Sequence, residues 1–143
     1  FWKRMAPPPN LEAFNAPSRE VCTVRRERTN TPLQALVTLN DPQFVEAARH
    51  LAERSLKHST DDAGIIHEIA QRVLSRSLTP KESAVVTATK GELLNYYRDN
   101  PEDAKALTSV GESRPDENLN MAVLAAWTMV CNEIMNLDEA LNK

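Results

Sequence analysis

The sequence predicts an all-α protein, an irregular bundle of five or six helices preceded by an extended N-terminal arm rich in proline and arginine. Two observations predict this fold class. Pairs made of a capping residue and a proline recur along the chain, and apolar residues recur at helical spacing after them. At 143 residues the chain fits one domain. We place the arm at residues 1–30 and the helical domain at residues 31–143.

The arm shows no sustained helical or strand period and contains four prolines. Proline fixes its own φ angle and disfavours helix in the residue before it, so we expect Pro7 to Pro9 to adopt the polyproline II conformation. The stretch VCTV, residues 21–24, has the composition of a short strand but no strand to pair with. We therefore expect little regular structure in the arm, which depends for its order on the helical domain or on a neighbouring copy.

Four helix starts are marked by a capping residue followed by proline, at Thr31-Pro32, Asp41-Pro42, Thr79-Pro80 and Asn100-Pro101. Gln34 and Glu82 stand three positions after the two threonines, which predicts a full capping box at each. We expect Asn100 to cap the short helix that follows it, with Asp103 adding a negative charge in the first turn.

Apolar spacing predicts how far the helices extend. One amphipathic stripe follows Asp41 and reaches about residue 58, another follows a start near Thr60, and a third follows Pro80. Residues 110–120 form the longest polar connection, which we expect to be a loop. The last helix begins near Asn120 and has the cleanest apolar stripe, so we expect its Trp127 and Cys131 to be buried.

The charge pattern argues against some functions. A formal net charge of −3 does not suit a general nucleic-acid binder, which needs a basic surface. The arm nevertheless holds six basic and three acidic residues, so it can attract the acidic helical domain or a neighbouring domain. No apolar run has the length of a membrane span. The chain begins FWKRM, and we expect it to be part of a longer protein.

The sequence contains no recognisable metal or catalytic motif. His50 and His58 stand eight residues apart, too far to chelate one metal ion from a helix, and His67 is isolated, so we expect no metal site. G-x-S-x-G, H-E-x-x-H and glycine-rich phosphate loops are absent. Paired acids in the first turns of helices are explained by the helix dipole. These observations favour a non-enzymatic role for this chain by itself.

The two cysteines, Cys22 and Cys131, lie too far apart for a C-x-x-C pair or a covalent haem attachment motif. They form either one disulfide or two free thiols, and the apolar position of Cys131 favours free thiols. We expect no cofactor in this chain.

One stretch, RRERTN at residues 25–30, is a candidate binding site. The guanidinium groups of Arg25, Arg26 and Arg28 suit carboxylate, phosphate or sulfate, and the helix start after Asn30 also favours anions. Arg25, Arg26, Arg28 and Asn30 are therefore our candidates for binding an anion or a protein partner. The competing interpretation is structural, with the arginines paired to helix carboxylates. We predict that at least one of the three arginines makes such a pair.

Three long motifs, RRERTNTPLQAL, LNDPQFVEAAR and WTMV, lie within a stretch of similarity that covers nearly the whole chain. The chain resembles the C-terminal domain of unknown function in large planctomycete proteins that also carry cytochrome-c-type domains. The resemblance implies an exported or periplasmic protein with haem bound elsewhere in the parent protein. It transfers no activity and no role for individual residues.

These observations lead to two expectations of function. The first is a helical structural or docking module at the C-terminus of an exported, cytochrome-c-associated protein, with the other domains of that protein as its partners. The alternative is part of an enzyme site in which the arginine stretch binds an anionic substrate, such as a sulfated or carboxylated polysaccharide.

Overall fold

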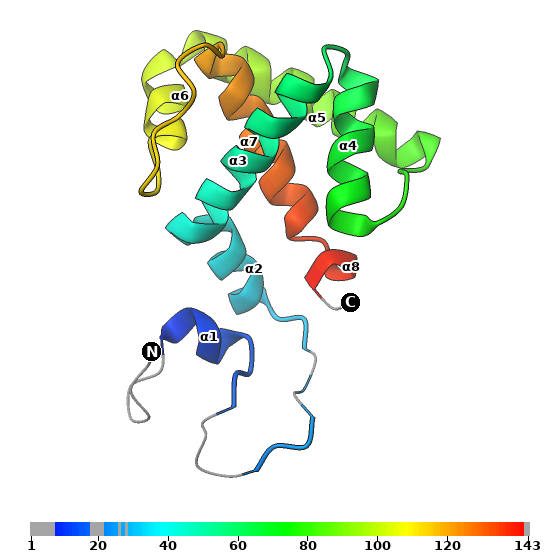
Figure 1. The fold of residues 1–143 in the computed structure, drawn as a ribbon, viewed down its shortest axis with the longest axis vertical. Helices are drawn as coiled ribbons and strands as arrows, with labels where there is room; N and C mark the ends of the chain where they lie inside the picture. The colour runs from blue at the N-terminus through cyan, green and yellow to red at the C-terminus, as the bar shows by residue number, and fades with distance from the viewer. Residues whose placement is uncertain (1–7, 18–21, 26, 28, 142–143) are drawn as a thin grey trace.

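The computed structural model describes residues 8–17, 22–25, 27 and 29–141, and within these ranges the protein is all-α, as predicted. Eight helices lie in this part of the chain (Figure 1). Their bounds are α1 Pro9–Ala13, α2 Pro32–Asn40, α3 Pro42–His58, α4 Asp62–Leu74, α5 Pro80–Asp99, α6 Pro101–Thr108, α7 Met121–Met135 and α8 Asp138–Leu141. The six predicted helices correspond to α2–α7. The sequence did not reveal α1 and α8, because helices of five and four residues are too short to show a period.

The predicted caps explain most of the helix starts. Both capping boxes are present: the backbone N–H of Gln34 donates to Thr31 Oγ1 at 3.3 Å, and the N–H of Glu82 donates to Thr79 Oγ1 at 3.3 Å. Asp41 caps α3 by accepting from the N–H of Gln43 at 2.9 Å. The helix expected near Thr60 begins at Asp62, after Asp61 as its cap.

Helix α6 begins after Asn100 with Asp103 in its first turn, as predicted, but the expected capping role of the Asn100 side chain is wrong. Its side chain makes no capping hydrogen bond to α6. Instead its Nδ2 donates to the carbonyl oxygen of Tyr96 at 2.9 Å, so it satisfies an acceptor at the end of α5. The reason is that α5 and α6 are separated by this one residue, which must serve both helix ends.

The N-terminal segment contains one helix that we did not predict. Pro8 has φ −58° and ψ 134°, which is polyproline-like, but Pro9 begins α1, so the expected polyproline segment does not extend through it. Pro7 lies outside the described residues. Cys22, Thr23 and Val24 form no strand. The aromatic rings of Phe14 and Phe44 lie 6.3 Å apart and connect the end of α1 to α3. The domain boundary at residue 30 remains a prediction.

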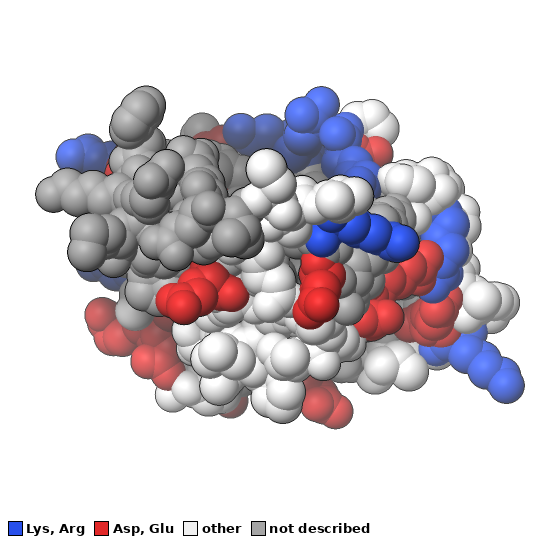
Figure 2. Space-filling model, turned by 90° about the horizontal axis from the view of Figure 1, so that it is seen from below, with Lys and Arg blue, Asp and Glu red and all other residues white. Residues whose placement is uncertain are grey.

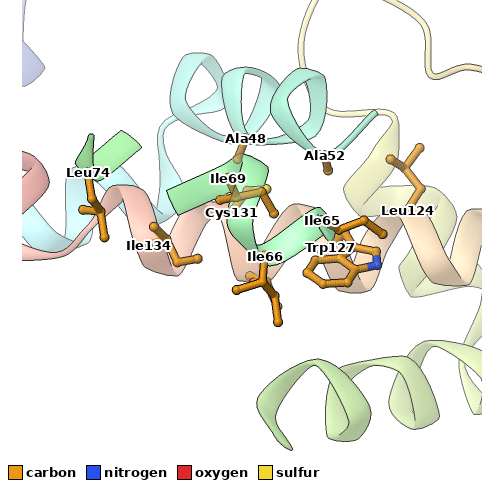
Figure 3. Packing of buried hydrophobic residues seen from close by; sticks show 11 residues of the cluster. Ala48, Ala52, Ile65, Ile66, Ile69, Leu74, Leu124, Trp127, Cys131 and Ile134 are labelled. Atoms are coloured by element: carbon orange, nitrogen blue, oxygen red, sulfur yellow. The ribbon is translucent and has the colours of Figure 1, made fainter. Parts of the chain in front are cut away.

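Helix α7 lies in the middle of the molecule and contacts α2, α3, α4, α5, α6 and α8 (Figure 1). Side chains from α3, α4 and α7 converge in the main core (Figure 3). Trp127 is 1% exposed and Cys131 is fully buried, which confirms both predictions. Ala48 and Ala52 of α3 have no exposed surface, and their small side chains allow α3 to pack closely against its neighbours.

Polar contacts fix the position of α2 against the end of α7. Thr38 Oγ1 donates to Asn136 Oδ1 at 2.5 Å, and Asn132 Nδ2 donates to the carbonyl oxygen of Leu39 at 3.2 Å.

Within the described ranges, no helix is both long enough and apolar enough to cross a membrane.

The two cysteines are free thiols in different environments, Cys22 exposed and Cys131 buried. Burial raises the pKa of the Cys131 thiol, so little reactive thiolate forms near neutral pH. We expect a thiol reagent to modify Cys22 rapidly in the native protein and Cys131 only after unfolding in urea. The Cys22→Ser variant isolates Cys131, and rapid modification of that variant without denaturant would contradict the burial of α7.

The close packing of α3 predicts a large effect of side-chain volume at Ala52. Ala52→Leu inserts three carbon atoms into a filled core and should lower the free energy of unfolding by about 1–3 kcal/mol. Ala47 lies on the exposed side of the same helix, so Ala47→Leu serves as the matched control. Urea denaturation of both variants measures the difference, and equal stability would show that the core around Ala52 is loosely packed.

Candidate functional site

The predicted binding residues do not gather into one pocket in the described structure. Arg25 is exposed at a bend and makes no ion pair with any described residue. Arg26 and Arg28 lie outside the described residues, so the predicted arginine–carboxylate pair remains a prediction. Asn30 points away from this stretch toward the C-terminus, where its Nδ2 donates to Asp138 Oδ1 of α8 at 2.8 Å.

Polar side chains hold together the two ends of the segment between α1 and α2, whose described residues are 15–17, 22–25, 27 and 29 and which we call the loop of residues 15–29. Asn15 Nδ2 donates to Thr29 Oγ1 at 2.7 Å, across fourteen residues of chain. Gln34 Nε2 donates to the same oxygen at 2.8 Å and to the carbonyl oxygen of Ala13 at 3.0 Å. Gln34 is 2% exposed and also forms the capping box of α2. The start of α2 therefore holds both ends of the loop.

The described residues at the far side of this loop face solvent. Val24 is fully exposed, and Cys22, Arg25 and Glu27 are exposed as well. On the face seen from below in Figure 2, basic and acidic side chains lie interspersed. The loop thus exposes one apolar side chain and one guanidinium group to solvent, while its two ends are held in place.

A second group of polar residues, which sequence reasoning missed, lies between α3 and the loop of residues 110–120. Arg49 is fully buried, and its guanidinium group donates to Glu53 Oε1 at 2.8 Å and to Ser113 Oγ at 2.7 Å. It also donates to the carbonyl oxygens of Ser113 at 2.9 Å and Arg114 at 3.3 Å. A buried guanidinium needs such partners to offset its desolvation.

Glu46 holds the first turn of the same loop. Its carboxylate accepts hydrogen bonds from the backbone N–H of Ser113 at 2.8 Å, from the N–H of Glu112 at 3.1 Å and from the Ser113 hydroxyl. These bonds, led by the one from the Ser113 side chain, lower the pKa of Glu46 from 4.5 to about 2. Gly111 has φ +105°, and a Cβ there would lie 2.4 Å from Glu46 Cδ, so the turn requires glycine.

His50 and Lys57 also connect α3 to the loop of residues 110–120. His50 Nε2 lies 2.8 Å from Ser113 Oγ, and its Nδ1 lies 3.3 Å from Glu53 Oε2. Lys57 pairs with Asp116 at 2.6 Å, and its hydrogen bond contributes most to lowering the pKa of Asp116 to about 2. We call these residues the α3–loop cluster: Glu46, Arg49, His50, Glu53, Lys57, Ser113 and Asp116.

The sequence contains a signal for the five members of this cluster that lie on α3. Its α3 members recur at spacings of three or four residues and therefore share one face of a helix. The distance of His50 from His58 in the sequence bears on a metal pair alone and does not indicate this cluster. The described residues include no group of three or more His, Cys, Asp or Glu side chains arranged to hold a metal ion.

The lowered pKa of Glu46 predicts how acid affects stability. A carboxyl group with a lower pKa in the folded state stabilises the protein above its unfolded pKa, and this contribution is lost as the pH falls from about 4.5 toward about 2. Glu46→Gln should therefore flatten the dependence of the urea midpoint on pH in this interval and lower the midpoint at pH 7.

The control for this experiment is Glu117→Gln, because Glu117 is exposed in the same loop. We expect it to leave both the pH dependence and the midpoint close to those of the unchanged protein. If Glu46→Gln gives the same acid unfolding curve as this control, the contact between Glu46 and the loop does not stabilise the fold.

Comparison with known proteins identifies the family of the chain. Residues 1–89 match the model of PSD1, a protein family of unknown function (DUF1553). The match covers the segment with the arginines, α2, α3, α4 and the first half of α5, while Ser113 and α7 lie beyond it. No curated protein and no solved structure gave a match. The chain belongs to the PSD1 family of proteins of unknown function (DUF1553).

Proposed function

We propose that this chain is a helical structural or docking module at the C-terminal end of an exported or periplasmic multidomain protein. The resemblance of its long motifs to planctomycete proteins with cytochrome-c-type domains supports this context. In this proposal the haem is bound by other domains of the parent protein, and those domains are the partners of the module. The module itself contributes a binding surface and no cofactor.

The observation that carries the proposal is the loop of residues 15–29. Its base is held by Asn15, Thr29 and Gln34, while Val24 and Arg25 are exposed. Because both ends are held, less conformational entropy is lost when a partner binds Val24 and Arg25. An arginine beside an apolar side chain is a combination typical of protein interfaces, where arginine is enriched and apolar groups form the centre.

Helix α2, which starts at the base of this loop, adds apolar surface. Leu33 and Leu36 stand three positions apart on one face and are 59% and 58% exposed. Together with Val24 they offer a partner apolar contact area on and next to the loop. We propose that the partner contacts both the loop and this face of α2.

One observation also favours the alternative, an anionic substrate such as a sulfated or carboxylated polysaccharide. The guanidinium group of Arg25 has no carboxylate partner among the residues that the structure describes, so its donors are available to an anion. An anion site at this position would complete an enzyme site together with the upstream domains.

A binding experiment tests the docking proposal. The upstream region of the parent protein is produced separately and titrated against this chain. Arg25→Glu should weaken binding about tenfold, because it replaces an interface cation by an anion, without changing the melting temperature. Lys81→Glu makes the same charge change at an exposed position in α5 and should bind like the unchanged chain.

The same two variants separate the alternatives when they are titrated with dextran sulfate. An anion site would be established in place of docking by two results together. Dextran sulfate binds the unchanged chain and Lys81→Glu but not Arg25→Glu, and the upstream region does not bind at all. If Arg25→Glu changes neither interaction, the loop of residues 15–29 is not a binding surface.

A further inference from the structure

We propose that Ser113, His50 and Glu53 can act as nucleophile, base and orienting carboxylate in the hydrolysis of small esters, and that Glu46 occupies the oxyanion position of this site. This activity is independent of the docking function and uses a different surface. Its basis is the geometry of the α3–loop cluster.

The three side chains have the connectivity of a hydrolytic triad. Ser113 Oγ lies 2.8 Å from His50 Nε2, and His50 Nδ1 lies 3.3 Å from Glu53 Oε2. A carboxylate accepts hydrogen bonds but cannot donate them, so Glu53 favours the tautomer with its proton on Nδ1. The Ser113 hydroxyl donates its proton to Glu46 in this conformation, so Nε2 can take that proton only after the carboxylate of Glu46 has moved away.

Donors for a developing oxyanion stand beside the same hydroxyl group. The backbone N–H of Ser113 donates to Glu46 Oε1 at 2.8 Å, and the neighbouring N–H of Glu112 donates to Glu46 Oε2 at 3.1 Å. An oxyanion is stabilised by donors at this distance, and one of them is commonly the N–H of the nucleophile itself. Glu46 Oε1, which accepts from the N–H of Ser113, thus occupies a place that suits the oxygen of a tetrahedral intermediate.

Arg49 adds a positive charge next to the nucleophile. Its Nη2 donates to Ser113 Oγ at 2.7 Å, and its side chain is held in place by complete burial. A cation at this distance stabilises the oxygen as it loses its proton. Glu46 opposes this effect, because its carboxylate accepts from the same hydroxyl and occupies the oxyanion donors. The site is therefore inhibited by its own chain in this conformation.

A cavity of about 560 Å³ adjoins the site and is lined by Asp41, Pro42, Gln43, Glu46, Gly111 and Glu112. Its volume lies within the range of about 300–1,000 Å³ that is usual for small-molecule sites. Three of its six residues carry carboxylates, which repel anionic groups and attract cationic ones. The substrate class is therefore a small ester without anionic groups, whose alcohol part is cationic or uncharged.

The reaction balances without a cofactor. Ser113 Oγ forms a bond to the ester carbonyl carbon, the π electron pair moves to the carbonyl oxygen, and His50 Nε2 takes the hydroxyl proton. Re-formation of the carbonyl breaks the bond to the alcohol oxygen, which receives the proton from His50. One water molecule then attacks the acyl group in the same way, so that acid is released and Ser113 regains its proton.

A fluorophosphonate probe tests the proposal, because it bonds to activated serine oxygens with loss of fluoride. Peptide mapping of the full chain should find the adduct on Ser113. His50→Ala should slow its formation about a hundredfold or more. Glu46→Gln should accelerate it about tenfold, the factor that corresponds to one charge-assisted hydrogen bond. Thermal melts establish that each variant is folded, with His50→Gln replacing His50→Ala if that variant is not.

Ser109→Ala is the matched control, because Ser109 is an exposed serine just before the loop and should not affect labelling. Hydrolysis of p-nitrophenyl acetate should follow the same order among the variants. The proposal is overturned if Ser113 is unmodified in both the unchanged chain and Glu46→Gln. It is also overturned if Ser113 is modified at the same rate without His50.

Discussion

The burial of α7 is the interaction on which the rest of the fold depends. Nine of its fifteen residues are buried, and they include Trp127, the largest fully buried side chain among the residues that the structure describes. Two faces of the helix are covered at once. One packs with α3 and α4 in the main core, and the other places Ala125 and Ala126 against Tyr97 and Ala104 of α5 and α6. Because each surrounding helix contacts α7, its apolar surface determines how the shorter helices are arranged.

Charged residues then hold the helices in position at the edge of this core. Arg76 donates to Glu82 at 2.9 Å and to Glu139 at 2.8 Å, which joins the turn after α4 to α5 and α8. These hydrogen bonds raise the pKa of Arg76. The hydrogen bond that Arg76 donates to Glu82 contributes most to lowering the pKa of Glu82 to about 2. Lys90 pairs with Asp62 at 2.8 Å and lies 5.5 Å from the ring centroid of Trp127. These five charged residues therefore have a structural role.

The two surfaces with proposed functions differ in how they are built. The loop of residues 15–29 is fixed at its base and exposes Val24 and Arg25, an arrangement suited to contact with a large partner. In the α3–loop cluster, polar groups are brought together around the buried Arg49, an arrangement suited to chemistry on a small molecule. One chain can carry both, because the helical core supports each surface separately.

The sequence by itself determined the fold class, the starts of the long helices and the buried stripe of α7. These features are local: a capping box joins residues three positions apart, as in Thr31 and Gln34, and a helical face repeats every three or four residues. The tertiary structure alone decided which distant residues meet. Glu46 and Ser113 are 67 residues apart in the chain, and Asn30 and Asp138 are 108 apart. No local pattern encodes such pairs, because the packing of α3 and α8 against α7 brings them together.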